Sequence, residues 1–228
     1  MDTPARTALK TQARWTSATL TRAAVHLAGL FPLAELAYHA AAQQLTVNPI
    51  QFIEQFFGLA ALNLLALSLA VTPLITLTGY KTLGRHSRAL GLYTFLYFSL
   101  HLLVFIGLDY SFDFSEILRL TAEKPFILAG AAAGLLLTAL ALTSFNYWKR
   151  LLRKNWKRLH RGVYLIGLLA VLHYAWALKG SLTTLSGDIL RPLLMGLLFL
   201  TLLALRLPPV KQAVTRLRRQ RTASVARP

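Results

Sequence analysis

Long uncharged apolar stretches alternate along this chain with short polar or charged connections. Six of the apolar stretches fall within the roughly 17–25 residues that an α-helix needs to cross a bilayer. They cover residues 22–42, 56–77, 90–108, 125–144, 162–178 and 189–207. The pattern predicts an all-α membrane protein, a six-transmembrane-helix bundle. Because residues 1–21 and 208–228 are polar and basic, we expect a poorly ordered arm and a tail that is disordered at its end, both outside this domain.

The charged connections predict the orientation of the bundle. Of the 25 Lys and Arg residues, 21 lie in the N-terminal arm through Arg22, the second and fourth connections, and the tail from Arg206 onward. Most of the acidic residues lie in the other connections. The positive-inside rule then places both termini in the cytoplasm. We find no obvious internal repeat.

Composition and charge exclude several classes of protein. A net charge of +17 could indicate a nucleic-acid partner, but the basic residues occupy alternate connections of a chain that is 55% hydrophobic. Anionic lipid headgroups explain this placement better, so we expect membrane lipids and no nucleic acid. The absence of cysteine excludes disulfides, thiolate-ligated haem, cysteine-bound iron–sulfur clusters and cysteine-based zinc sites.

A dense basic segment, 148–161, leads into an apolar helix that has a histidine near each end, His160 and His173. Thirteen residues of helix span about 20 Å, compared with a bilayer core of about 30 Å. The two side chains should therefore lie at two depths, which suggests two metal centres stacked across the membrane, most often haem iron. A regular helix would turn them about 140° apart, so we expect a bend, a π-bulge or an irregular first turn.

His101, in the third apolar stretch, should lie at the same depth as His173. Both helices are expected to run outward from the cytoplasm, and both histidines lie about 16–17 Å along them. Two imidazoles at one level on two helices are the arrangement needed for the axial ligands of one haem b. The pair predicts a haem site held by His101 and His173.

Several residues could be the second ligand of a metal centre that His160 holds near the cytoplasmic face. His86 and Arg88 lie before the third apolar stretch, and His26 lies at the start of the first. His26 and His39 are also 13 residues apart, so the first stretch is an alternative second helix that could supply histidine ligands at two depths. The alternative to metal binding for each histidine is a hydrogen bond to a neighbouring helix or a place on a proton path.

Two histidine-bearing segments, RALGLYTFLYFSLHLLVFIGLD (88–109) and WKRLHRGVYLIGLLAVLHYAW (156–176), carry a resemblance to a known family. VHLAGLFPL in the first stretch and KPFILAG at 124–130 add to it. The chain resembles the haem-binding membrane subunit of periplasmic methionine-sulfoxide reductase systems, the MsrQ (YedZ) type, which has a ferric reductase-like transmembrane domain.

The resemblance implies a b-type cytochrome in the bacterial inner membrane that carries one or two haems b. Its electrons would come from the quinone pool or a cytosolic flavin reductase. They would pass to a periplasmic molybdopterin-containing methionine-sulfoxide reductase that repairs oxidised proteins. The chain would be an electron-transfer subunit and not the catalytic subunit. FMN is also associated with the family, although the sequence shows no motif for it.

The haem ligands of the family carry over onto His101, His160 and His173. Related reductase domains place a further ligand 14 residues before the histidine of the third span. Here that position is Ser87, between His86 and Arg88. Either neighbour is a candidate cofactor-binding residue for a second haem.

Two other functions compete with this one. The same histidines would serve a stand-alone ferric or metal reductase membrane domain. A non-redox transporter would use intramembrane histidines to carry protons, and it would bind no haem. The chain has no GxGxxG element to bind a nicotinamide dinucleotide.

Overall fold

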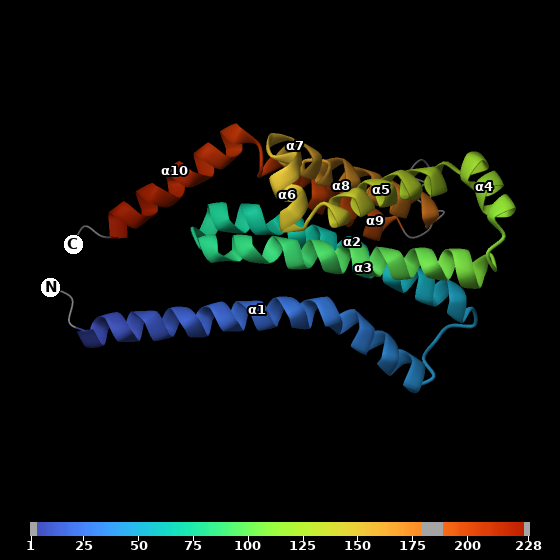
Figure 1. The fold of residues 1–228 in the computed structure, drawn as a ribbon, viewed down its shortest axis with the longest axis horizontal. Helices are drawn as coiled ribbons and strands as arrows, with labels where there is room; N and C mark the ends of the chain where they lie inside the picture. Colours follow the sequence, from blue (N-terminus) through green and yellow to red (C-terminus); the bar gives the residue numbers. More distant parts are fainter. Residues whose placement is uncertain (1–3, 179–188, 226–228) are drawn as a thin grey trace.

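The computed structural model describes residues 4–178 and 189–225, and every regular element among them is helical (Figure 1). The all-α fold is therefore confirmed. The elements in chain order are α1 (Pro4–Ala41), α2 (Pro49–Thr78), the 3-10 helix η1 (Lys81–His86), α3 (Ser87–Leu103), the π-helix η2 (Val104–Asp109), α4 (Phe114–Glu123), α5 (Pro125–Leu142), α6 (Asn146–Leu152), α7 (Lys154–His160), α8 (Val163–Ala177), α9 (Leu190–Ala204) and α10 (Pro208–Val225).

The described helices include three that are long and apolar enough to cross a membrane: α2, the continuous segment Lys81–Asp109, and α5. A fourth is obtained if α9 and α10, which meet at a bend of 76°, form one span. α8 has 15 residues, fewer than the roughly 20 of a straight span. The chain is thus a multi-pass helical membrane protein, and the count of six spans stays a prediction.

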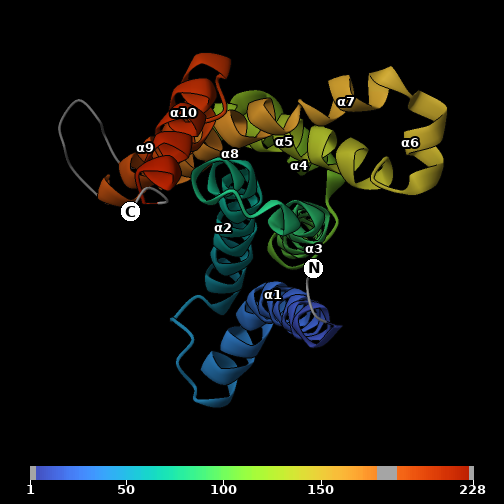
Figure 2. The same cartoon turned by 90° about the vertical axis from the view of Figure 1, so that its left-hand side faces the viewer.

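The helices form three layers around α2 and α3. Figure 2 shows α1 on one side of this pair and α5, α8 and α9 on the other. In Figure 1, α1, α3 and α8 run in one direction along the long axis, and α2, α5 and α9 run back. The central position of α2 is reflected in its packing, since Leu69 meets Ile166 and Phe199 in one buried cluster and Phe57 meets Tyr97 in another.

Both ends of α2 are determined by local sequence. The Asn48 side chain accepts a hydrogen bond from the backbone N–H of Gln51, and Pro49 occupies the first turn, where its missing N–H costs nothing. At the other end Gly79 adopts a φ of 80° and donates its N–H to the Ile75 carbonyl. Glycine is favoured at this position because the left-handed conformation strains other residues.

A proline inside α2 leaves a backbone carbonyl without its helical hydrogen-bond donor, and an arginine from the C-terminal part of the chain supplies one. Pro73 has no N–H for the carbonyl of Leu69, one turn earlier. The Arg206 guanidinium donates to that carbonyl at 2.7 and 3.2 Å. Arg218 of α10 donates to the Thr76 carbonyl at 2.7 Å in the last turn of α2. Cations near a helix C-terminus are also favoured by the helix dipole, so these arginines stabilise the end of α2.

The N-terminal arm that we expected to be poorly ordered is helical wherever the structure describes it, and the basic tail is helical as far as Val225. α1 begins at Pro4, and the basic tail forms α10 from Pro208. The arm differs from the expectation because its residues favour a helix, whereas the end of the tail, 226–228, lies outside the described residues. Ala, Leu, Lys, Arg and Gln are good helix formers, and α10 is also held to α2 by Arg218. The connection 179–188 lies outside the described residues.

Candidate functional site

The structure brings His101 of α3 and His173 of α8 together. Their ring centroids lie 6.1 Å apart and the ring planes are inclined by 77°. Both side chains are partly buried. Because α3 and α8 run in the same direction (Figure 1), the two imidazoles meet at one level between two parallel helices.

A backbone carbonyl determines the tautomer of each imidazole. His101 Nδ1 lies 2.9 Å from the carbonyl oxygen of Glu54 on α2, and His173 Nδ1 lies 2.7 Å from that of Phe126 on α5. A carbonyl oxygen can only accept, so each Nδ1 must carry the proton and donate it. The Nε2 atom of each ring then keeps its lone pair. Such outer hydrogen bonds orient histidine ligands and make them more basic.

A glycine one turn beyond each carbonyl lets the imidazole lie against the helix. A Cβ atom at Gly58 would stand 3.2 Å from His101 Nδ1. A Cβ atom at Gly130 would stand 2.7 Å from His173 Nδ1, closer than such contacts occur. Both glycines are therefore part of the site, and our sequence analysis missed them.

The two histidine environments are copies of one arrangement. Each histidine follows its acceptor carbonyl by 47 residues and its packing glycine by 43 residues. The α2–α3 pair thus corresponds to the α5–α8 pair. No repeat is obvious in the sequence itself, because the similarity lies in spacing and contact and not in the hydrophobic residues between. A glycine 43 residues before a histidine, occurring twice, was the available signal.

The donor set restricts the metal that the pair could hold. Within the described residues, no group of three or more His, Cys, Asp or Glu side chains comes together. Two metal–nitrogen bonds of about 2 Å and two imidazole radii separate ring centroids by roughly 6 Å, which agrees with the observed 6.1 Å. The arrangement suits one metal ion that brings its remaining ligands with it.

His160 lies outside this pair, at the end of α7. Its ring stacks on Trp156 at 4.0 Å, and its Nδ1 donates to the Trp156 carbonyl at 3.1 Å. Burial lowers the pKa of His160 and favours the neutral ring. α7 ends at His160 and α8 starts at Val163. Because the helix is broken at this point, His160 and His173 do not share one regular helix, and the 140° offset does not apply.

His86 and Arg88, the candidate partners of His160, lie at the start of α3. His86 is buried and lines a cavity with residues of α1, whereas Arg88 also lies 5.4 Å above the Phe145 ring. In the described part of the chain, neither forms a hydrogen bond or ring contact with His160. The ligand set of a second centre therefore stays a prediction.

The rival histidines of α1 have other partners. His26 Nδ1 lies 3.0 Å from the Tyr93 hydroxyl, and His39 Nδ1 lies 3.1 Å from the Gln44 side-chain oxygen. Among the described residues, the ring contacts of His26 and His39 are with Tyr93, Tyr38 and Phe52, and neither ring contacts the His101–His173 pair. His26 thus contacts a neighbouring helix and His39 contacts a loop. For His39 in particular, this favours a structural hydrogen bond over metal binding.

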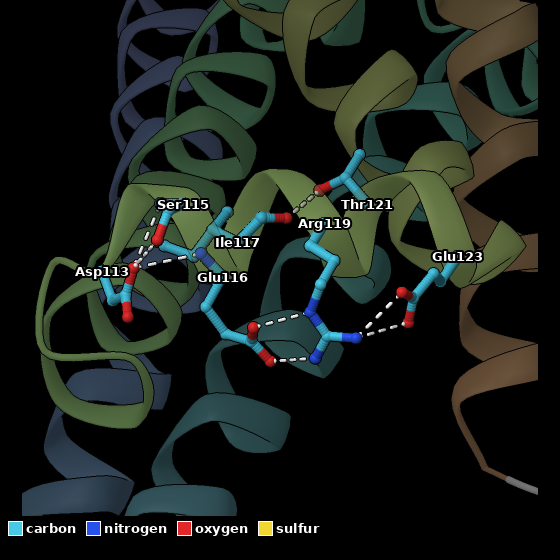
Figure 3. A network of polar contacts seen from close by, with 7 residues as sticks. All are labelled: Asp113, Ser115, Glu116, Ile117, Arg119, Thr121 and Glu123. Carbon is cyan, nitrogen blue, oxygen red and sulfur yellow. Dashed lines mark hydrogen bonds and ion pairs between the residues drawn. The ribbon is translucent and has the colours of Figure 1, made fainter.

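The acidic connection forms a short helix at the end of the bundle opposite the chain termini, α4 (Figures 1 and 3). The Asp113 carboxylate caps it by accepting from the Ser115 hydroxyl and the Glu116 N–H, and these bonds lower the Asp113 pKa. Arg119 donates to both Glu116 and Glu123. Its hydrogen bonds lower the pKa of Glu116 below the usual value. α4 therefore presents an exposed charged surface.

Comparison with known proteins shows the family of the chain. The profile of the family described as "Ferric reductase like transmembrane component" matches residues 57–171. The protein-methionine-sulfoxide reductase heme-binding subunit MsrQ of Xanthomonas campestris pv. campestris (strain B100) is 43% identical over 167 residues, 71% of this chain and 77% of that protein. The chain belongs to the MsrQ family. MsrQ of Bordetella pertussis (strain Tohama I) is 41% identical over 180 residues, 79% of this chain and 85% of its own.

The match covers much of the site. The ferric reductase-like region of this MsrQ-family chain includes His101 and His160 and ends two residues before His173. No solved structure matches the chain.

Proposed function

We propose that this MsrQ-family protein is a transmembrane b-type cytochrome that serves as the electron-transfer subunit of an oxidoreductase system. Electrons would enter from the quinone pool or a cytosolic flavin reductase. They would leave to a periplasmic molybdopterin-containing methionine-sulfoxide reductase that repairs oxidised periplasmic proteins. The observation that carries the proposal is the His101–His173 pair, with ring centroids 6.1 Å apart and both Nε2 atoms available. The relatives' name, heme-binding subunit, supports the same cofactor.

The residues present fit a haem b held by His101 and His173. The carbonyls of Glu54 and Phe126 keep both Nδ1 atoms protonated, so that both Nε2 atoms keep the lone pair that a metal–nitrogen bond would use. When bound, haem supplies a centre that takes up and releases one electron at a time. The two helices would be held at a fixed separation by the shared ligation.

A second haem would use His160, with His86 or Arg88 as the other ligand. Support comes from the His160 ring, which is partly buried and is oriented by the hydrogen bond from its Nδ1 to the Trp156 carbonyl. The proposal thus covers one or two haems b, and FMN as a further cofactor that the family resemblance implies.

The proposal includes six spans in the bacterial inner membrane with both termini in the cytoplasm. Residues 1–21 would be the cytoplasmic arm, 22–207 the haem domain and 208–228 the basic cytoplasmic tail. Figure 1 supports this orientation, since both chain ends lie at one end of the bundle and the acidic helix α4 lies at the other. The periplasmic reductase would then meet the α4 end.

The test is a reduced-minus-oxidised visible spectrum of the detergent-purified protein, with haem quantified per chain. The variants are His101→Ala, His173→Ala and His160→Ala, and His39→Ala is the control because its partner is Gln44. We expect a b-type spectrum in the wild type and the control, and loss of one haem in both His101→Ala and His173→Ala. Loss of a second haem in His160→Ala would support two centres.

Full haem content in either variant of the pair would overturn the assignment of its ligands. A protein with no haem, even when haem is supplied during expression, would overturn the redox proposal and favour the histidine-dependent transporter.

The family profile also supports a stand-alone ferric reductase as a second candidate. The two functions differ in the electron acceptor. Reduced protein would be mixed with a ferric chelate or with an oxidised periplasmic methionine-sulfoxide reductase, and the rate of reoxidation measured. Faster reoxidation by the ferric chelate would favour the second candidate.

A further inference from the structure

A second candidate site lies away from the histidine pair. A cavity of about 490 Å³ opens between α1, η1 and the start of α3. Its polar lining includes three arginines and two histidines, with no carboxylate among the lining residues. These five residues are Arg22, His26, Arg85, His86 and Arg88.

The positive charge of the cavity is not neutralised within the described protein. The ion pairs among the described residues are those that Arg119 of α4 forms with Glu116 and Glu123. Arg22, Arg85 and Arg88 therefore form no ion pair with a described carboxylate. Like charges gathered in one concavity repel each other and raise the local concentration of anions. The cavity therefore favours a negatively charged ligand.

The most buried polar residue of the cavity has an unused polar atom. His86 is 7% exposed, and its Nε2 has no hydrogen-bond partner among the described residues. A buried polar atom without a partner is destabilising, and such atoms are rare in folded proteins. A ligand oxygen that reaches this buried atom from the cavity would supply the missing partner.

The position of the cavity indicates the kind of anion. η1 connects the end of one membrane-spanning helix, α2, to the start of the next, α3, so the cavity lies at the level of the lipid headgroups. Basic pockets between spanning helices at this level bind anionic headgroups. The planar guanidinium group of arginine matches the oxygens of a phosphate, to which it can donate two parallel hydrogen bonds.

We propose that this cavity binds a phosphate ester, carried either by an anionic lipid headgroup or by a soluble molecule. Arg22, Arg85 and Arg88 pair with its oxygens at the open rim, and His86 Nε2 hydrogen-bonds to it from the buried side. The inference does not depend on the His101–His173 pair or on which side of the membrane the cavity faces. It is an alternative to the use of His86 or Arg88 as a ligand of a second haem.

The test uses the full-length protein in detergent and native mass spectrometry with two probes, dioleoyl phosphatidylglycerol and glycerol 3-phosphate. The cavity variant is the double substitution Arg22→Gln with Arg85→Gln, both at exposed positions. The control, Arg150→Gln with Arg158→Gln, removes the same charge from exposed positions of α6 and α7. We expect one ligand per chain in the wild type and the control, and binding about ten-fold weaker in the cavity variant.

The probes distinguish the two sources. Saturation by the lipid alone identifies a headgroup site, and saturation by glycerol 3-phosphate with displacement of the lipid identifies a soluble ligand. His86→Gln, checked by its thermal unfolding, should weaken binding of the same probe. The proposal is overturned if neither probe saturates at one per chain, or if both double variants lose binding equally, which would indicate general surface charge.

Discussion

At His101 and His173, the main chain determines which ring nitrogen is free. Each acceptor is a backbone carbonyl, so the side chain at that position has no part in the bond. This explains why the two equivalent positions can carry residues as different as Glu54 and Phe126. The requirement falls instead on Gly58 and Gly130, where a side chain would occupy the space of the imidazole.

Gly130→Ala should reduce haem binding at the pair. The added methyl group would stand 2.7 Å from His173 Nδ1, and overpacking of this kind costs about 1–3 kcal/mol. We expect a haem content per chain several-fold below wild type, and a smaller loss in Gly58→Ala, where the distance is 3.2 Å. The measurement is the reduced-minus-oxidised spectrum normalised to protein.

The matched control is Gly91→Ala, since a Cβ atom at Gly91 has no neighbour within 4 Å. It should retain the wild-type spectrum. A Gly130→Ala protein with full haem and unchanged absorbance would show that the close approach of His173 to α5 is not required.

Sequence reasoning found the histidine pair but not the residues that orient it. The regular rise of a helix was enough to place His101 and His173 at one depth. The packing of Gly58 and Gly130 depends on how each helix is rotated toward its neighbour. A single hydropathy pattern does not contain that rotation when a helix is apolar on all sides.

At the scale of elements, the apolar cores of the helices were predictable and their irregular ends were not. The stretches 56–77 and 125–144 fall almost wholly within α2 (Pro49–Thr78) and α5 (Pro125–Leu142). The π-helix η2 begins three residues after His101, and the break between α7 and α8 directly follows His160. Irregular turns of this kind are frequent at functional sites.

Arg206→Met should destabilise the bundle through α2. The substitution leaves the Leu69 carbonyl without a donor, because Pro73 cannot supply one. Loss of a hydrogen bond from a charged donor costs about 1.5–3 kcal/mol. We expect a lower midpoint of thermal unfolding in detergent, followed by circular dichroism.

Arg216→Met is the control, because Arg216 is exposed on α10. Its midpoint should stay close to wild type. Equal midpoints for Arg206→Met and the wild type would show that another group, such as water, satisfies the carbonyl.

At the scale of the molecule, the segregation of charge along the bundle follows from the sequence and the fold together. The positive-inside rule assigned a side to each connection, and the structure gathers the chain ends at one end and α4 at the other (Figure 1). The correspondence between the α2–α3 and α5–α8 pairs could not be read from hydropathy, because both pairs are almost uniformly apolar.

Single cysteines would establish the orientation, because the chain has none of its own. Ala122→Cys lies on α4, Asn155→Cys on α7 and Gln220→Cys on α10, all at exposed positions. We expect a membrane-impermeant maleimide to label Ala122→Cys in intact spheroplasts. Asn155→Cys and Gln220→Cys should be labelled only after permeabilisation. The reverse pattern, or labelling of Asn155→Cys and Gln220→Cys from opposite sides, would contradict the six-span topology.

The hydrogen bond from Arg206 to Leu69 also has a consequence for the order of events during synthesis. The two residues are 137 positions apart. At about 5–20 residues per second, a ribosome reaches Arg206 roughly 7–27 s after Leu69. During that interval the nascent α2 holds a carbonyl that proline has left without its helical partner. A product truncated before Arg206 therefore retains this defect in a helix made early, and differs there from the full-length protein.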